Sequence, residues 1–176
     1  MERRRQAGGE HHMTFNETQI NFDESIEQLE QQIEDIAEQL DELDDDNPAV
    51  PGLQSRRSRL ATQRKGAIWA RDRAHESDDF PEWDEDVDGV TLSGVRAGTF
   101  AGIEQESAER GGEGTDLLLI ADGTVEAPYV CDNDDMTAAA VGQLHPYYRD
   151  WASSRIDELM DPEGNVIGSS DSPKET

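Results

Sequence analysis

The sequence has few of the features that identify an enzyme, a membrane protein or a secreted scaffold. Its 176 residues include one cysteine, Cys131, so no disulfide can form within the chain. No apolar run approaches the roughly 18 residues needed to cross a bilayer, and no signal peptide is recognisable. Phosphate-binding loops, dinucleotide motifs and paired-cysteine motifs are missing too. These absences predict a cytoplasmic protein that is not an enzyme and has no membrane anchor and no cofactor.

Positive charge is also scarce. Acidic residues outnumber basic ones 41 to 15, which gives a net charge of −26, and the only lysines are Lys65 and Lys174. Such a chain would repel a nucleic-acid backbone. At molar salt the Debye length falls to about 3 Å, and most of the self-repulsion is screened. The charge resembles that of proteins from extreme halophiles, particularly haloarchaea, and predicts a high-salt cytosol.

The strongest periodic signal lies in residues 22–43. Seven large apolar residues follow one another at alternating spacings of four and three, the pattern of a coiled-coil seam. They are Phe22, Ile26, Leu29, Ile33, Ile36, Leu40 and Leu43. Asn21 is placed to cap this helix, with Glu24 completing a pair of the capping-box type. Acidic and amide side chains fill most other positions, so the remaining faces are expected to be solvated.

A second helix is expected after the break at residues 47–52, which contain two prolines and a glycine. Apolar side chains then recur every seven residues, at Leu53, Leu60, Ala67 and Ala74. Because the connection is short, the second helix should return antiparallel to the first. Setting Leu43 against Leu53 brings Ile36 opposite Leu60, so one register aligns the layers. Residues 22–76 are therefore predicted to form an antiparallel, coiled-coil-like helical hairpin.

Charge supports this pairing, because residues 23–46 carry twelve acids and no base, while residues 53–74 carry seven bases and one acid. Three arginines follow the seam of the second helix at seven-residue spacing. The expected ion pairs are Arg57 with Asp44, Arg64 with Glu30, and Arg71 with Asp23. A basic helix can also indicate nucleic-acid binding, but here its charge has an acidic counterpart within the chain.

The two predicted helices differ in their apolar content. The first has seven large apolar residues, whereas the second has two leucines, an isoleucine and several alanines. Something else should cover the rest of the seam, because each exposed Leu or Ile forgoes about 1.5–3 kcal/mol of burial. The C-terminal domain, a second copy and a foreign helix are the alternatives. The predicted partner-binding residues are Ile26, Leu29, Ile33, Ile36, Leu40 and Leu43.

The rest of the chain divides by composition. The predicted units are a disordered tail over 1–21, an acidic linker over 77–89, a small α-rich domain over 90–162 and a flexible tail over 163–176. Within the α-rich domain, residues 90–92 read as a short extended piece, and helices are expected near 97–110, 134–144 and 147–160. Residues 117–120 fit either a strand or a buried helix. Asp132 or Asp134 is expected to cap the second of these helices.

Candidate metal ligands and nucleophiles are weak. Asp84, Asp86, Asp88 and Gly89 match the opening of a calcium loop, but the twelfth position, which needs a bidentate carboxylate, is Val95. Nucleophilic catalysis would need a Ser or Cys near a His and an orienting acid, and no such group is recognisable in the sequence. The sequence therefore predicts no metal site and no catalytic residue.

One family resemblance covers residues 90–160. Val90-Thr91-Leu92, the helix through Phe100–Glu104, Leu118-Leu119-Ile120, Val125–Tyr129, Leu144-His145-Pro146 and Ile156–Leu159 resemble the tail assembly chaperones of long-tailed viruses and proviruses. The resemblance implies a non-enzymatic chaperone that coats the coiled-coil tape-measure protein during tail assembly. The alternative function is a structural coiled-coil virion component or oligomeric scaffold, in which the partner is another copy.

Overall fold

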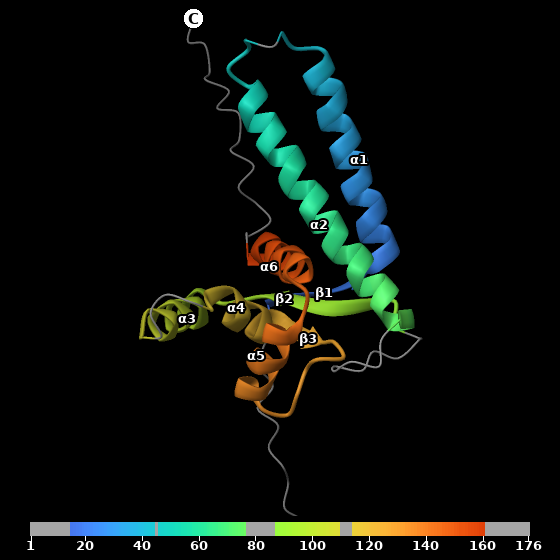
Figure 1. Cartoon of the computed structure of the whole chain (residues 1–176). Coiled ribbons are helices and arrows are strands. Elements are labelled where there is room, and N and C mark those ends of the chain that lie inside the picture. The colour runs from blue at the N-terminus through green and yellow to red at the C-terminus, as the bar shows by residue number, and fades with distance from the viewer. Residues whose placement is uncertain (1–14, 45, 77–86, 110–113, 161–176) are drawn as a thin grey trace, which may run out of the picture.

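The computed structural model describes residues 15–44, 46–76, 87–109 and 114–160, which fold mainly into helices (Figure 1). The predicted mainly helical fold class is confirmed. In chain order the elements are β1 (Phe15–Asn21), α1 (Phe22–Asp41), α2 (Val50–Glu76), β2 (Gly89–Gly94), α3 (Ala97–Glu109), α4 (Thr115–Gly123), β3 (Thr124–Glu126), α5 (Asp134–Gln143) and α6 (Pro146–Met160).

A side-chain cap sets the start of α1. Asn21 has extended backbone angles, and its side-chain oxygen accepts a hydrogen bond from the backbone N–H of Glu24 at 3.1 Å. The predicted cap is therefore confirmed. The backbone N–H of Phe22 donates to the carbonyl oxygen of Asp88 at 2.9 Å, which ties the first turn of α1 to the segment before β2.

The connection between α1 and α2 ends earlier than the sequence break indicated. Asn47 accepts a hydrogen bond from the backbone N–H of Ala49 at 2.9 Å, and α2 begins at the next residue, Val50. Pro51 and Gly52 thus belong to the helix, and the prediction that they lie in the turn is wrong. The reason is positional, because a proline in the first turn of a helix removes an N–H that has no partner there.

The chain also contains a small antiparallel sheet in the order β1-β2-β3. Ile20 of β1 pairs with Val90 of β2, and a Cβ on Gly89 would lie only 2.3 Å from the carbonyl oxygen of Ile20. The prediction of disorder through residue 21 is therefore wrong for residues 15–21. Their polar sequence has no helical period, and the hydrogen bonds come from β2, which is about 70 residues away in the sequence. Residues 1–14 lie outside the described residues.

The C-terminal helices follow the predicted pattern closely. The expected helices near 97–110, 134–144 and 147–160 correspond to α3, α5 and α6, and the extended piece at residues 90–92 lies in β2. Residues 117–120 belong to α4, which resolves the ambiguity between strand and buried helix. The cap of α5 differs from the prediction, because the N-cap residue is Asn133, whose side chain accepts from the backbone N–H groups of Asp135 and Met136.

The elements share one hydrophobic core. Buried residues of α1 and α2, including Phe22 and Ala67, belong to the same cluster as Leu92 of the sheet and Trp151 and Ile156 of α6. In Figure 1, α1 and α2 rise together from the sheet, and α6 lies beside the lower part of α2. The helices predicted as a hairpin and the helices predicted as a separate α-rich domain therefore share buried side chains. The predicted linker residues 77–86 and tail residues 163–176 lie outside the described part of the chain.

Candidate functional site

The six residues predicted to bind a partner do not share one environment. Ile26, Leu29 and Ile36 are buried in the core, with at most 6% of each residue exposed. They are not accessible to a partner in this structure. Ile33 and Leu40 are only partly buried against the core, and Leu43, just beyond α1, is partly buried as well. Leu53 of α2 is also partly buried. We call Ile33, Leu40, Leu43 and Leu53 the distal seam.

Helix α6 covers the proximal end of the α1–α2 pair on the α1 side. Trp151 is fully buried, and its ring centroid lies 5.8 Å from that of Phe22. Its indole N–H donates a hydrogen bond to the hydroxyl of Ser25 at 3.0 Å. A buried indole N–H needs such a partner. The contact therefore fixes α6 against the first turns of α1.

The α2 side of the same contact is closer still. The amide nitrogen of Gln63 donates to the hydroxyl of Ser154 at 2.8 Å. A Cβ on Gly66 would lie 2.0 Å from the carbonyl oxygen of Tyr147, so the backbones of α2 and α6 touch here. One of the sequence alternatives, cover by the C-terminal part of the chain, thus applies to the proximal seam. Neither Ser25 nor Gln63 was predicted from the sequence. Small or neutral side chains beside the seam, among charged neighbours, are the signal for such contacts.

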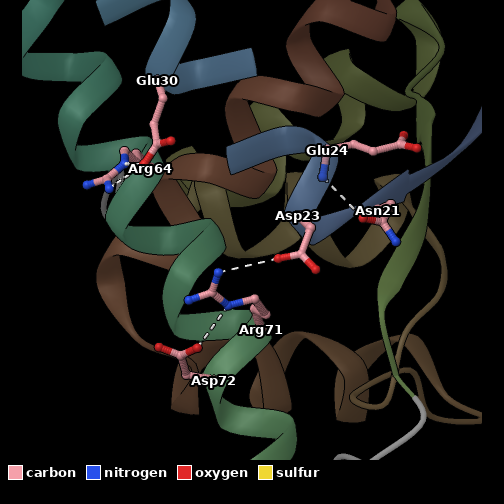
Figure 2. Close-up of polar contacts among 7 residues, drawn as sticks. All are labelled: Asn21, Asp23, Glu24, Glu30, Arg64, Arg71 and Asp72. Atoms are coloured by element: carbon pink, nitrogen blue, oxygen red, sulfur yellow. Dashed lines mark hydrogen bonds and ion pairs between the residues drawn. The ribbon is translucent and has the colours of Figure 1, made fainter. Parts of the chain in front are cut away.

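Ion pairs join the outer edges of α1 and α2, as Figure 2 shows. Arg64 contacts Glu30 with its Nε 2.7 Å from the carboxylate, and Arg71 contacts Asp23 at 3.3 Å. Two of the three predicted pairs are therefore present. Arg71 also donates to Asp72 at 2.9 Å, and this hydrogen bond, with a smaller contribution from Asp23, raises the pKa of the Arg71 guanidinium.

The third predicted pair, Arg57 with Asp44, is absent from the ion pairs of the described residues. The two observed pairs explain why. Arg71 and Arg64 are seven residues apart, and so are their partners Asp23 and Glu30. The next step of seven leads from Arg64 to Arg57 and from Glu30 to Ala37, which carries no charge. The row of ion pairs between α1 and α2 therefore ends at Arg64 and Glu30, next to the distal seam.

The register of α1 on α2 can be tested by crosslinking. With Cys131 replaced by Ser, cysteines at Ile36 and Leu60 should form a disulfide within one molecule, because both positions are buried along the α1–α2 contact. Non-reducing electrophoresis and mass spectrometry of the monomer would detect it. Cysteines at Ile36 and Gly52 are the control, since Gly52 is two helical turns away in α2 and should not react. Crosslinking of the control pair alone would contradict the register.

The most perturbed titratable groups lie in the core. The hydroxyl of Tyr129 lies 3.0 Å from those of Thr124 and Tyr148. Burial raises the pKa of Tyr129 to about 12, and burial also raises the pKa of Tyr148 well above its usual value. Both phenols therefore stay protonated at neutral pH. This arrangement satisfies buried hydroxyl groups and gives neither tyrosine the lowered pKa of a nucleophile.

His145 and Cys131 also take structural roles. The Nδ1 of His145 accepts a hydrogen bond from the backbone N–H of Tyr147 at 3.1 Å, at the start of α6. The backbone N–H of Cys131 donates to the hydroxyl of Thr137 at 3.0 Å, and its thiol is partly buried. These contacts tie loops to helix starts. They do not bring the thiol and the imidazole together as a catalytic pair.

A cavity of about 410 Å³ lies between β1, the start of α1 and the end of α6. Its arginine, Arg155, donates to Glu158 at 2.7 Å, and its Ser25 hydroxyl accepts from Trp151. These polar groups are engaged internally, so the cavity presents no activated nucleophile. Within the described ranges, His, Cys, Asp and Glu side chains do not form a group that could hold a metal ion. Asp84 and Asp86 of the calcium-like stretch lie outside those ranges.

No helix in the described part of the chain is long and apolar enough to cross a membrane. The chain matched no protein-family model, no curated protein and no solved structure. The distal seam combines half-buried apolar side chains with the absence of a charged residue at Ala37, the α1 position where the next ion pair would lie.

Proposed function

We propose that this chain is a non-enzymatic assembly protein that binds a helical protein partner through the distal seam. The observation that carries the proposal is the unequal cover of the α1–α2 pair. Trp151 of α6 packs on the pair near Ser25, whereas Leu40 and Leu53 remain only partly buried at the far end. Beyond α6 no further labelled element lies alongside the pair (Figure 1). A coiled-coil-like surface with an open apolar seam suits a partner that supplies another helix.

The family resemblance of residues 90–160 favours one kind of partner. A tail assembly chaperone of a long-tailed haloarchaeal virus or provirus would use this surface on the coiled-coil tape-measure protein during tail assembly. The net charge of −26 fits work in a high-salt cytosol. Self-association through the same seam is the alternative. In that case the protein would be an oligomeric scaffold or a structural coiled-coil component of the virion.

Substitution of Ile33 and Leu40 by Asp should abolish partner binding. Burial of two such side chains contributes about 3–6 kcal/mol, and its loss corresponds to a weakening of more than a hundredfold. The measurement is coexpression of the full chain with a candidate tape-measure protein, followed by pull-down in about 1 M KCl. The fold should survive, because both residues are only partly buried.

A matched control places the same two charges on the outer faces of the helices. Gln31 and Ser55 are both exposed, and Gln31→Asp with Ser55→Asp should leave binding unchanged. Unchanged binding by the Ile33→Asp/Leu40→Asp protein would contradict the proposal. So would cooperative loss of the whole fold in that protein, since it would identify the seam as ordinary core. Binding of the wild-type chain to a second copy, and not to the tape-measure protein, would favour the scaffold if the Ile33→Asp/Leu40→Asp substitutions abolish it.

A further inference from the structure

The stripe of α2 that contacts α6 continues beyond it. Gln63 and Gly66 touch α6, and the positions three and four residues apart on one side of a helix lie on the same face. Stepping from Gly66 through Gln63 toward the start of α2 leads to Arg59 and then Arg56. Both arginines are exposed, and neither takes part in an ion pair among the described residues. Two unpaired positive charges therefore extend the α6-binding face.

Among the described residues, no carboxylate on the facing flank of α1 forms an ion pair with them. Ser25 touches α6, and steps of seven residues along the same flank lead to Gln32 and Gln39, which carry no charge. Asp35 lies between them on this flank, and its carboxylate accepts a hydrogen bond from the side-chain amide of Gln31 at 2.8 Å. Glu34 and Asp41 are also seven residues apart, but by helical spacing they lie on the flank that contains Glu30 and Ala37. The groove beyond α6 is thus bordered by two amides and the hydrogen-bonded Asp35 on α1 and by two unpaired arginines on α2, with the distal seam between them.

We infer that this groove binds an acidic amphipathic helix, placed alongside α1 and α2 beyond the end of the α6 contact. The apolar stripe of that helix would cover Leu40 and Leu53, and its carboxylates would contact Arg56 and Arg59. The inference rests on the proposed function and specifies the chemistry of its partner. The net negative charge of the chain does not oppose it in molar salt, because at a Debye length of about 3 Å only groups in contact interact strongly.

Two synthetic peptides test the inference. Both are about 20 residues long, which is enough for a helix to form on binding, and both carry Leu and Ile at coiled-coil spacing. One has Glu at the other positions and the second has Lys. Binding to the full chain is measured by fluorescence anisotropy in about 1 M KCl. The Glu peptide is expected to bind at least tenfold more tightly than the Lys peptide, since opposite charges in contact discriminate between partners.

A pair of variants locates the charge contact. Arg59→Glu should weaken binding of the Glu peptide about tenfold, whereas Arg57→Glu should change it less than twofold. Arg57 and Arg59 are both exposed and differ by two residues, which places them on opposite sides of α2. The two substitutions change the net charge equally. Circular dichroism would confirm that both variants keep the wild-type fold.

Several outcomes would overturn the inference. Equal or tighter binding of the Lys peptide would do so, as would binding of neither peptide. A dimer of the wild-type chain that Arg59→Glu dissociates would show that the groove is occupied by a second copy instead. Pull-down of a tape-measure protein that depends on Ile33 and Leu40, but not on Arg59, would refute the inference and leave the proposed function standing.

Discussion

In about 0.1 M salt the protein is expected to lose much of its helical structure, with α1 melting first. This helix carries eight acidic residues and no basic one. Glu30, Glu34 and Glu38 follow one another at spacings of four, where like charges lie about 5–6 Å apart at Cβ and repel. The Debye length is about 10 Å at 0.1 M, so this repulsion is unscreened, and about 3 Å at 1 M, where it is mostly screened.

Circular dichroism from 0.1 M to 3 M KCl should therefore show a rising helix content and a rising Tm. Substitution of Glu34 and Glu38 by Gln should move the transition to lower salt, since two like-charge pairs are removed and neither carboxylate belongs to a described ion pair. Sucrose serves as the control, because it stabilises compact states without screening charge. A Tm that does not change with KCl would contradict the halophilic interpretation of the composition.

Gly66→Ala is expected to destabilise the protein by about 3 kcal/mol or more, which is large against the stability of a small domain. The added Cβ would lie 2.0 Å from the Tyr147 carbonyl oxygen and 3.0 Å from the Trp151 Cβ. The backbone of α6 cannot yield as a flexible side chain would, so α6 must move away from α2. That movement would disturb the Trp151–Ser25 and Gln63–Ser154 hydrogen bonds. Alanine favours a helix over glycine by only about 1 kcal/mol, which is too little to compensate.

Gly52→Ala provides the comparison in the same helix. No heavy atom lies within 4 Å of a Cβ at Gly52, so this substitution should be neutral or stabilise the protein by up to about 1 kcal/mol. Urea denaturation in about 2 M KCl, monitored by tryptophan fluorescence, would measure the free energy of unfolding of both variants. Equal stability of the two variants would show that the contact between α2 and α6 contributes little to the fold.

The sequence alone determined the features that depend on short spacings. The 3.5-residue repeat predicted α1, Asn21 predicted its cap, and the seven-residue spacing of Arg64 and Arg71 predicted their pairs with Glu30 and Asp23. The C-terminal helices were predicted for the same reason. Each of these sequence patterns spans one or two helical turns, or repeats with a period that is common to α1 and α2.

Only the tertiary structure decided which residues of the seam are covered. Ile26 and Ile36 obey the same repeat as Ile33 and Leu40, but the first two are buried and the others are not fully so. Their burial depends on packing between distant segments. Ile26 lies at the end of α1 where Trp151, about 125 residues away in the sequence, donates a hydrogen bond to Ser25. β1 likewise exists because β2 supplies its hydrogen bonds from a distant part of the chain. A local pattern shows which side chains need cover, but contacts between distant segments decide where the cover lies.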